Sequence, residues 1–371
     1  MRRSLLSFVS LLSFLSFACR EPDHLPQASI SVASALRTEN NQGYARAIEP
    51  REFRFPEDHG PHPEFRTEWW YYTGNLSTRE GRRFGFQLTF FRSAVAPTMP
   101  ERSSQWATRQ AYLAHFTITD VEGKRFRSFE RWGRGALGLA GSQGEPFRVW
   151  LKDWSAEMGR LRASEDSIAL DLTLQPGKPP VLQGERGLSR KSEEPGNASY
   201  YYSLTRMPAS GTIRLGDERF EVSGLAWMDR EWSTSSLGKD QVGWDWFALQ
   251  LEDGRDLMLY QLRRKDGTAD ATSNGTLVGP RGESRHLSLS DFELEVVDRW
   301  ESPRSGASYP AGWRLRIPSA DLDLRIEPLL SDQELDVSFR YWEGAVQVEG
   351  SSRGRGYVEM TGYNDLSRRS E

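Results

Sequence analysis

The chain has 371 residues, of which 48 are Lys or Arg and 52 are Asp or Glu, so its formal net charge is −4 at pH 7. No block of like charges stands out, which argues against an electrostatic binding surface for nucleic acid. Cys19 is the only cysteine and no intrachain disulfide can form, so the fold must depend on its core. Beyond Cys19 about 350 residues remain, enough for two domains of roughly 150 residues or more.

The N-terminus has the pattern of a lipoprotein signal peptide. Two arginines precede an apolar stretch from Leu5 to Phe17, which is too short for a membrane-spanning helix. Cys19 follows Ala18 at the position where bacterial lipoproteins are lipidated. We therefore expect a signal over residues 1–19, a flexible tether over 20–50, and a location in a bacterial cell envelope, either periplasmic or anchored to the membrane through lipidated Cys19. Cleavage after Ala18 without lipidation stays open.

From residue 51 onwards, short segments rich in β-branched and aromatic residues predict strands. Turns such as Glu80-Gly81 and Asp253-Gly254 separate them. The only helix that we expect is a short one around Ser331 to Leu335. The sequence thus predicts an all-β fold, with strands at 84–92, 111–121, 167–174, 200–206, 218–223, 244–251, 257–263, 292–300, 313–317 and 357–362.

A weak internal repeat indicates two similar β units in tandem. An aromatic strand, a Gly turn and a second strand with a Gln-Leu pair occur twice, with Gln87 and Gln261 at equivalent places. Two unrelated hairpins would produce the same pattern, so coincidence stays open. Many short alternating strands with an excess of aromatic residues fit antiparallel barrels that enclose a ligand cavity. We expect an N-terminal barrel over 51–190 and a C-terminal barrel over 191–371.

The stretch 64–74 sets one acidic side chain, Glu68, in an unbroken aromatic run. Because successive side chains of a strand alternate, this run has two faces, formed by Glu68, Trp70 and Tyr72 and by Trp69, Tyr71 and Thr73. Either face is a candidate pocket wall. The alternative is a strand buried on both sides, in which an arginine such as Arg66 or Arg230 neutralises Glu68.

Three segments, 55–74, 200–206 and 224–232, together resemble the AttH-type, lipocalin-like family of bacterial exported proteins. Members of this family are often described as predicted secreted hydrolases and are related to the carotenoid 1,2-hydratases. The resemblance covers residues 50 to 365. It implies two tandem calycin-type barrels. Family members are often associated with envelope ABC-type transporters, so the resemblance also implies such a transporter as a partner.

The hydratase branch of that family is thought to use a His and a Trp two residues apart, followed downstream by a Tyr-x-Asp. The matching positions here are Arg230 and Trp232, and then Tyr260 and Leu262, so the His and the Asp are absent. An arginine with a pKa above about 12 cannot supply the proton that hydration of a double bond needs. The resemblance therefore argues against carotenoid hydration.

Asp229 and Glu231 are the first candidate acid–base pair, because residues two apart share a strand face and neighbouring carboxyl groups can split their pKa values. Glu68 and His59 are further candidates for acid or base. The competing interpretation is a buried ion network that includes Arg230 or Arg66. His115 fits a buried core histidine better than a catalyst.

Metal and serine-hydrolase chemistry have little support. Asp58, His59 and His62 lie within five residues, but a Gly-Pro turn separates the histidines and no further His cluster exists, so we expect no metal and no cofactor. Residues 350–354 match the Gly-x-Ser-x-Gly pattern, but an all-β chain does not offer the strand-turn-helix context of a nucleophile elbow.

The sequence favours a carrier of an apolar lipid- or isoprenoid-like ligand, held in an aromatic-lined barrel. The expected ligand-binding residues are Trp69, Trp70, Tyr72, Gln87, Tyr201, Trp232, Trp246 and Tyr260. Two alternatives stay open. One is a hydrolase or hydro-lyase acting on such a ligand, and the other is an accessory subunit of an envelope ABC-type transporter.

Overall fold

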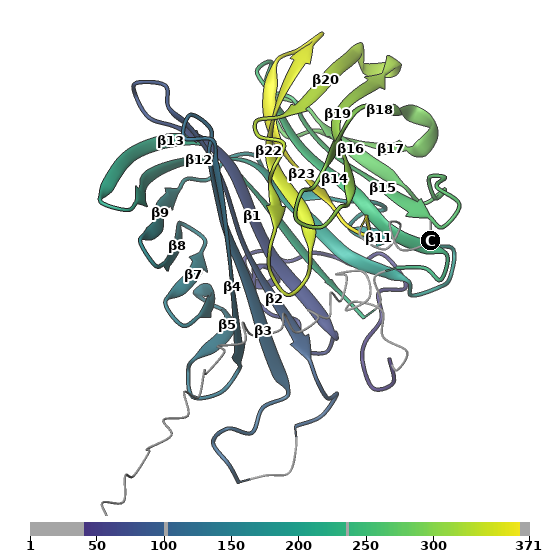
Figure 1. Ribbon diagram of the computed structural model, residues 1–371. Helices are drawn as coiled ribbons and strands as arrows, with labels where there is room; N and C mark the ends of the chain where they lie inside the picture. Colours follow the sequence, from purple (N-terminus) through teal and green to yellow (C-terminus); the bar gives the residue numbers. More distant parts are fainter. Residues whose placement is uncertain (1–40, 100–102, 235–236, 364–371) are drawn as a thin grey trace, which may run out of the picture.

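The computed structural model describes residues 41–99, 103–234 and 237–363 (Figure 1). The expected signal peptide, Cys19 and residues 20–40 of the expected tether lie outside the described residues. Residues 41–50 are not a free tether, because they pack on the first barrel. Ala47 is fully buried there, and the Tyr44 hydroxyl donates to the Ala94 carbonyl at 3.1 Å.

The first barrel consists of a 13-stranded antiparallel sheet. Its strands are β1 (Thr67–Ser77), β2 (Arg83–Ala94), β3 (Gln110–Asp120), β4 (Arg125–Arg134), β5 (Ala140–Gly144), β6 (Phe147–Leu151), β7 (Trp154–Glu157), β8 (Arg160–Glu165), β9 (Ile168–Leu174), β10 (Val181–Leu182), β11 (Leu188–Arg190), β12 (Ala198–Leu215) and β13 (Glu218–Ser233). A 3-10 turn, η1 (Glu57–His59), precedes β1.

The second barrel consists of a 10-stranded antiparallel sheet. Its strands are β14 (Gln241–Leu251), β15 (Asp256–Arg264), β16 (Asn274–Val278), β17 (Ser284–Ser288), β18 (Glu293–Glu301), β19 (Ser308–Ile317), β20 (Leu322–Pro328), β21 (Glu334–Leu335), β22 (Tyr341–Gly350) and β23 (Gly354–Met360). Two more 3-10 turns, η2 (Leu289–Asp291) and η3 (Pro318–Ala320), complete the described elements.

Both sheets have the same connectivity, which supports the tandem repeat. In the first sheet β4, β3, β2 and β1 follow one another, and β1 then pairs with β13. In the second sheet β17, β16, β15 and β14 follow one another, and β14 then pairs with β23. In each unit, therefore, the first strand lies against the last. The all-β fold and the tandem lipocalin-like barrels predicted from the sequence are confirmed.

The chain passes from the first barrel to the second later than the expected boundary at residues 190 and 191. β11 and β12, which lie on either side of residue 190, both belong to the first sheet, and the second sheet begins at β14. The Pro- and Gly-rich segment that suggested a boundary between Pro176 and Ala198 is a connection within the first barrel. The helix expected around Ser331 to Leu335 is also wrong, because this segment contains the short strand β21, paired with β22. In the described residues no helix is long and apolar enough to cross a membrane.

The barrels lie side by side, with β1 and β2 against β23 and β22 (Figure 1). Side chains on one face of these strands fill the interior of their own barrel, in two separate apolar cores. Those on the opposite face meet in a third cluster between the barrels, which includes Tyr71, Trp246 and Tyr357. Central strands are thus buried on both faces, which explains their nearly continuous aromatic and apolar sequences.

An ion cluster on Asp256 holds the two barrels together. Asp256, at the start of β15, is completely buried. Its carboxylate accepts from Lys178 Nζ at 2.7 Å, from Thr205 Oγ1 at 2.8 Å and from Arg206 Nε at 2.8 Å, and these three donors belong to the first barrel. Removal of the carboxylate charge would leave two cations without compensation at the contact between the barrels.

We therefore expect Asp256→Asn to lower the free energy of unfolding by about 3–5 kcal/mol, the usual effect of breaking a buried ion pair. Urea unfolding followed by tryptophan fluorescence measures this. The control is Asp323→Asn, which removes a half-exposed pair with Arg314 of 2.6 Å and should lower stability much less than Asp256→Asn does, because solvent screens this pair. Equal effects of the two variants would show that the Asp256 cluster does not hold the barrels together.

Candidate active site between the two barrels

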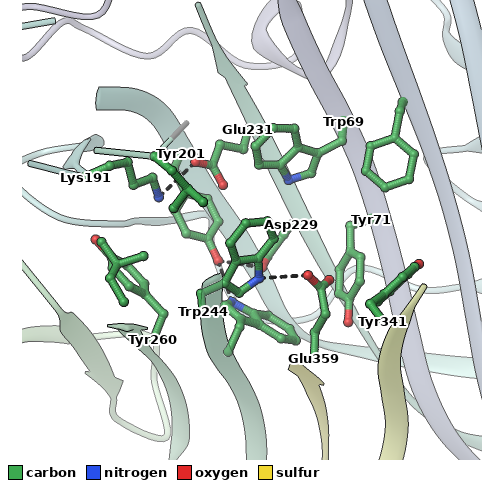
Figure 2. A pocket seen from close by; sticks show the side chains of 14 residues that line it. Trp69, Tyr71, Lys191, Tyr201, Asp229, Glu231, Trp244, Tyr260, Tyr341 and Glu359 are labelled. Carbon is green, nitrogen blue, oxygen red and sulfur yellow. Dashed lines mark hydrogen bonds and ion pairs between the residues drawn. The ribbon is translucent and has the colours of Figure 1, made fainter. Parts of the chain in front are cut away.

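A cavity lies where the outer faces of the two barrels meet, with about 820 Å³ of empty space when the open solvent at its mouth is included (Figure 2). The first barrel contributes side chains from β1, β2, β12 and β13, and the second contributes side chains from β14, β15, β22 and β23. Aromatic rings form most of the wall, namely Trp69, Tyr71, Phe91, Tyr201, Trp244, Trp246, Tyr260 and Tyr341. The sequence analysis placed the ligand inside a barrel, whereas the structure places this cavity between the barrels.

The strand register brings two carboxyl groups of β13 to the cavity. Asp229 lies opposite Tyr71 of β1, and Glu231 lies opposite Trp69. Arg230, between them, points the other way into the first barrel, where its guanidinium lies 4.1 Å from the centre of a Trp70 ring. Alternation along one strand thus separates the acidic residues from the arginine that the sequence suggested as their partner.

Asp229 is held entirely by neutral donors. Its carboxylate accepts from Tyr201 OH at 2.5 Å, from Ser203 Oγ at 2.5 Å and from Trp227 Nε1 at 2.7 Å. Burial raises the pKa of Asp229 to about 7, because these hydrogen bonds offset only part of the desolvation of the charged form. Near neutral pH this group exchanges a proton readily.

Glu359, on β23, is the second such group. Trp244 Nε1 donates to its carboxylate at 2.8 Å (Figure 2). Burial raises the pKa of Glu359 to about 7, and the negative charge of Asp229 contributes to this rise. Glu343, opposite Glu359 in the β22–β23 ladder, is completely buried, and burial and the charge of Glu359 raise its pKa well above the usual range.

Glu231 has a different environment. It forms an ion pair of 3.0 Å with Lys191, whose ammonium group lies 4.7 Å from the centre of the Tyr260 ring. Burial alone would lower the pKa of Lys191, but the charge of Glu231 outweighs it and the pKa is raised, so this lysine stays charged. The Tyr260 hydroxyl accepts from Asn274 Nδ2 at 2.6 Å. This end of the cavity is polar and has fixed hydrogen-bonding groups.

Six of the residues that the sequence suggested for the site line the cavity: Asp229, Glu231, Trp69, Tyr201, Trp246 and Tyr260. The other six lie elsewhere. Trp70, Tyr72 and Trp232 belong to the core of the first barrel, because they occupy the inner face of their strands. Gln87 is buried between the barrels and donates to Thr89 Oγ1 and Tyr341 OH. Glu68 and His59 form separate networks, described next.

Glu68 is the centre of a buried ion cluster in the first barrel. It is completely buried, and its carboxylate accepts from Arg92 Nε, from Arg230 Nη2 and from the His62 backbone N–H. Burial alone would raise the pKa of Glu68, but the two guanidinium groups hold it well below its usual range. Glu68 is therefore a fixed anion with a structural role, as the alternative interpretation of the sequence proposed, and Arg92 is a partner that the sequence did not indicate.

His59 is likewise outside the cavity. Its Nδ1 lies 2.6 Å from the Tyr202 hydroxyl, in the first barrel. Burial and the charge of Arg230 lower the pKa of His59 to about 4, so it is neutral near pH 7. The nearby His62 stacks on Trp232 and bonds Asp58 at 3.0 Å. Among the described residues no three His, Cys, Asp or Glu side chains are grouped so that they could hold a metal ion.

Sequence reasoning missed three polar residues of the cavity, namely Lys191, Tyr341 and Glu359. Glu359 lies within an expected strand, and a single acid in an apolar strand was the same signal that singled out Glu68. Lys191 lies in a charged segment that suggested a linker, and Tyr341 begins a strand that was not predicted. Only the packing of β22 and β23 against the first barrel brings Tyr341 and Glu359 to Asp229 (Figure 2).

These two sheets, packed face to face around one cavity, define a tandem lipocalin-like protein. The chain matches the AttH-like family model over residues 46–363 and belongs to this family. The crystal structure of an AttH protein from Nitrosomonas europaea is 36% identical, with a TM-score of 0.78, and the match covers 86% of this chain and 99% of that one.

Two further relatives carry names of enzymes. Kievitone hydratase from Nectria haematococca shares the fold, with a TM-score of 0.63 and 17% identity over 83% of this chain and 92% of that one. The curated protein dehydratase asqC from Emericella nidulans is 22% identical over 236 residues. This match covers 58% of the chain and 64% of that relative, so less than two thirds of asqC is matched.

The raised pKa values predict a pH-dependent stability. A carboxyl group whose pKa rises on folding stabilises the native state below its unfolded pKa, near 4, and this contribution is lost as the pH rises through about 7. Because amides do not titrate, we expect Asp229→Asn and Glu359→Gln to be more stable than the parent at pH 8, by up to roughly 3 kcal/mol, and to differ less at pH 5.

Urea unfolding at the two pH values measures this difference. Glu349→Gln, an exposed position on the same sheet, is the control and should show no such pH dependence. If both cavity variants were less stable than the parent to the same extent at pH 5 and pH 8, the two carboxyl groups would not have raised pKa values.

Glu68→Gln, in contrast to the two cavity variants, should destabilise the protein near neutral pH. Because Arg92 and Arg230 would lose their common anion, we expect a loss of about 3–5 kcal/mol at pH 7. Circular dichroism during thermal unfolding measures it. The loss should shrink as the pH falls through the low folded pKa of Glu68, and a variant as stable as the parent at pH 7 would contradict the structural role.

Proposed function

We propose that this protein is a hydro-lyase, which adds water to or removes water from an apolar, ring-containing molecule bound between the two barrels. One observation carries the proposal: two buried carboxyl groups, Asp229 and Glu359, face one aromatic cavity and both have a pKa of about 7. Groups with a pKa near the working pH are the most effective general acids and bases.

The two groups are coupled. The charge of Asp229 raises the pKa of Glu359, so ionisation of one favours the neutral form of the other. Near pH 7 the pair therefore holds about one proton, and the cavity offers one acid and one base at the same time. Addition of water to a double bond needs a proton for one carbon atom, and removal of water needs a base for the same proton. A shared proton serves both directions.

The walls of the cavity favour a substrate with a ring or a flat unsaturated chain. The indoles of Trp69, Trp244 and Trp246 offer faces for stacking. The ion pair of Lys191 with Glu231 supplies a polar end that can orient a carbonyl or hydroxyl group. The hydratase and dehydratase names of the relatives agree with this chemistry. Arg230 and Trp232, the positions that resemble the carotenoid hydratase pair, are buried in the first barrel, so the acid–base groups proposed here are different ones.

A carrier was the function that the sequence favoured, and the same cavity would hold an apolar ligand. Burial of two carboxyl groups without a countercharge costs stability, and a carrier of an apolar ligand gains nothing from it. The raised pKa values therefore favour the enzyme. We further propose, from the N-terminal sequence alone, that the protein is exported and anchored through Cys19. Incorporation of labelled palmitate that disappears in Cys19→Ser would support this anchor.

The hydro-lyase proposal can be tested with aromatic enones, for example benzylideneacetone, and with their water adducts. We expect the parent protein to interconvert the two, as followed by the ultraviolet absorbance of the enone. Asp229→Asn and Glu359→Gln should each lower kcat by about 10²- to 10⁴-fold, the usual contribution of a general acid or base. The rate should be greatest near pH 7.

Asp171→Asn, in an exposed ion pair of the first barrel, is the matched control and should keep full activity. A protein that binds the enones, as detected by quenching of tryptophan fluorescence, but turns none of them over would favour the carrier instead. Full activity of Asp229→Asn and Glu359→Gln would exclude the proposed acid–base pair.

A further inference from the structure

A buried hydrogen-bond chain leads from the surface into the cavity and is not explained by the carboxyl pair. His115, on β3, is 1% exposed. Its Nε2 lies 3.2 Å from a carboxylate oxygen of Glu130, on β4, and its Nδ1 lies 2.7 Å from the hydroxyl of Tyr341, on β22. Tyr341 lines the cavity, whereas the Glu130 side chain is 14% exposed. The chain therefore joins solvent, the first barrel and the cavity.

The direction of these hydrogen bonds follows from the charges. Burial alone would raise the pKa of Glu130, but hydrogen bonds from His115, Ser338 and Trp132 outweigh it and the pKa is lowered. Glu130 is thus an anion that can only accept, so His115 must donate Nε2–H to it. Burial lowers the pKa of His115, and the ring is neutral near pH 7. Its Nδ1 therefore has a lone pair and accepts the O–H of Tyr341.

This arrangement leaves Tyr341 as an acceptor towards the cavity. Its proton points to His115, and Gln87 Nε2 donates to its oxygen at 3.1 Å. A phenol oxygen has two lone pairs, and the second one faces both the cavity and Glu343, which is also a hydrogen-bonding neighbour of Tyr341. The order carboxylate, imidazole, hydroxyl is that of a hydrolytic triad, in which the imidazole takes the proton of the hydroxyl. A tyrosine stands here in the place of the serine.

The other ionisable groups near Tyr341 do not replace this relay. Glu343 on β22 and Glu359 on β23 both raise its pKa, after burial itself, so that the phenol does not ionise on its own. Tyr71 of β1 carries a hydroxyl with an equally raised pKa. Among these groups His115 is the neutral base that is within hydrogen-bonding distance of the phenol.

We propose that Tyr341, supported by His115 and Glu130, handles the oxygen of the water that is added or lost. This inference rests on the proposed hydro-lyase function and refines it: the carboxyl pair exchanges the proton on carbon, and Tyr341 exchanges the proton on oxygen. Tyr341 is the catalytic residue, and His115 and Glu130 are positioning residues that act through it.

In the direction of hydration, water loses one proton and adds to the double bond. The O–H bond of water breaks and its proton moves to the Tyr341 oxygen, while the Tyr341 proton moves to His115 Nδ1. The water oxygen forms a bond to one carbon of the double bond, and the electron pair of the double bond takes a proton from the carboxyl pair at the other carbon. The new imidazolium is paired with Glu130 and loses its extra proton to solvent through it, while the carboxyl pair takes up one proton from solvent at the open side of the cavity, so both sites are restored. Dehydration follows the same path in reverse.

The protonation of His115 can be tested without any substrate. In protein labelled with ¹⁵N at histidine, with His115→Gln used for assignment, we expect a neutral ring with the proton on Nε2 from pH 6 to pH 8. Tyr341→Phe should shift the Nδ1 resonance because it loses its donor. A proton on Nδ1, or an imidazolium, over this pH range would overturn the proposal, since the Tyr341 proton would then be free to point into the cavity.

The enone assay separates the two proton transfers. With the water adduct in D₂O, Tyr341→Phe should lower the loss of water by about 10²- to 10⁴-fold but keep the exchange of the carbon-bound proton. Glu359→Gln should lose both. His115→Gln should lower kcat without a change in KM. Equal loss of both reactions in Tyr341→Phe, or normal loss of water, would overturn the assignment.

Tyr357→Phe is the matched control, because it also removes a buried hydroxyl between the barrels, one that does not line the cavity. It should leave both reactions unchanged. If the parent protein turns over no enone, the hydro-lyase function fails. The affinities of the protein for 1-phenylethanol and for its methyl ether, which cannot donate a hydrogen bond, then test whether Tyr341 accepts one. A preference for the alcohol of about fivefold, lost in Tyr341→Phe, supports this role, and an unchanged preference overturns it.

Discussion

The central strands of this protein are buried on both faces, and this constraint shapes everything else in the structure. In β1 and β13 one face fills the first barrel and the other meets the second barrel. A strand with two buried faces can carry an ionisable residue only if its charge is paired or if the group becomes neutral. On β13, Arg230 of the inner face has a charged partner, and the adjacent Asp229 of the outer face has a raised pKa.

On the inner face the charge is compensated. Glu68, Arg92 and Arg230 neutralise one another and fix β1, β2 and β13 together. On the outer face Glu231 is paired with Lys191, but Asp229 has no cationic partner. Asp229 has only neutral donors, so its pKa rises to about 7 and it becomes a group that can exchange protons. The ion cluster that stabilises the first barrel and the carboxyl group with a raised pKa thus lie on opposite faces of neighbouring strands. Glu68, the acidic residue within the aromatic run of the sequence, is therefore structural.

The second barrel completes the site. β14, β22 and β23 cover the outer face of the first barrel, exclude water from Asp229, and supply Glu359 and Tyr341. Neither barrel alone contains both members of the carboxyl pair, and neither contains both His115 and Tyr341. The presence of two barrels therefore has a structural consequence: the face that a single barrel would expose to solvent becomes one wall of an aromatic cavity.

The alternating aromatic strands and Gly turns of the sequence were enough to predict an all-β chain, and the family resemblance implied the two tandem barrels. The sequence also indicated Asp229 and Glu231, because residues two apart must share a face. It could not say which face of β1 or β13 looks into a barrel and which looks towards the partner barrel, since both faces of each strand combine aromatic with charged or polar residues. Only the tertiary structure decided this, and with it the exclusion of Glu68, Trp70 and Trp232 and the inclusion of Lys191, Tyr341 and Glu359. These contacts join residues far apart in the chain, whose pairing depends on how two complete sheets pack rather than on any local pattern.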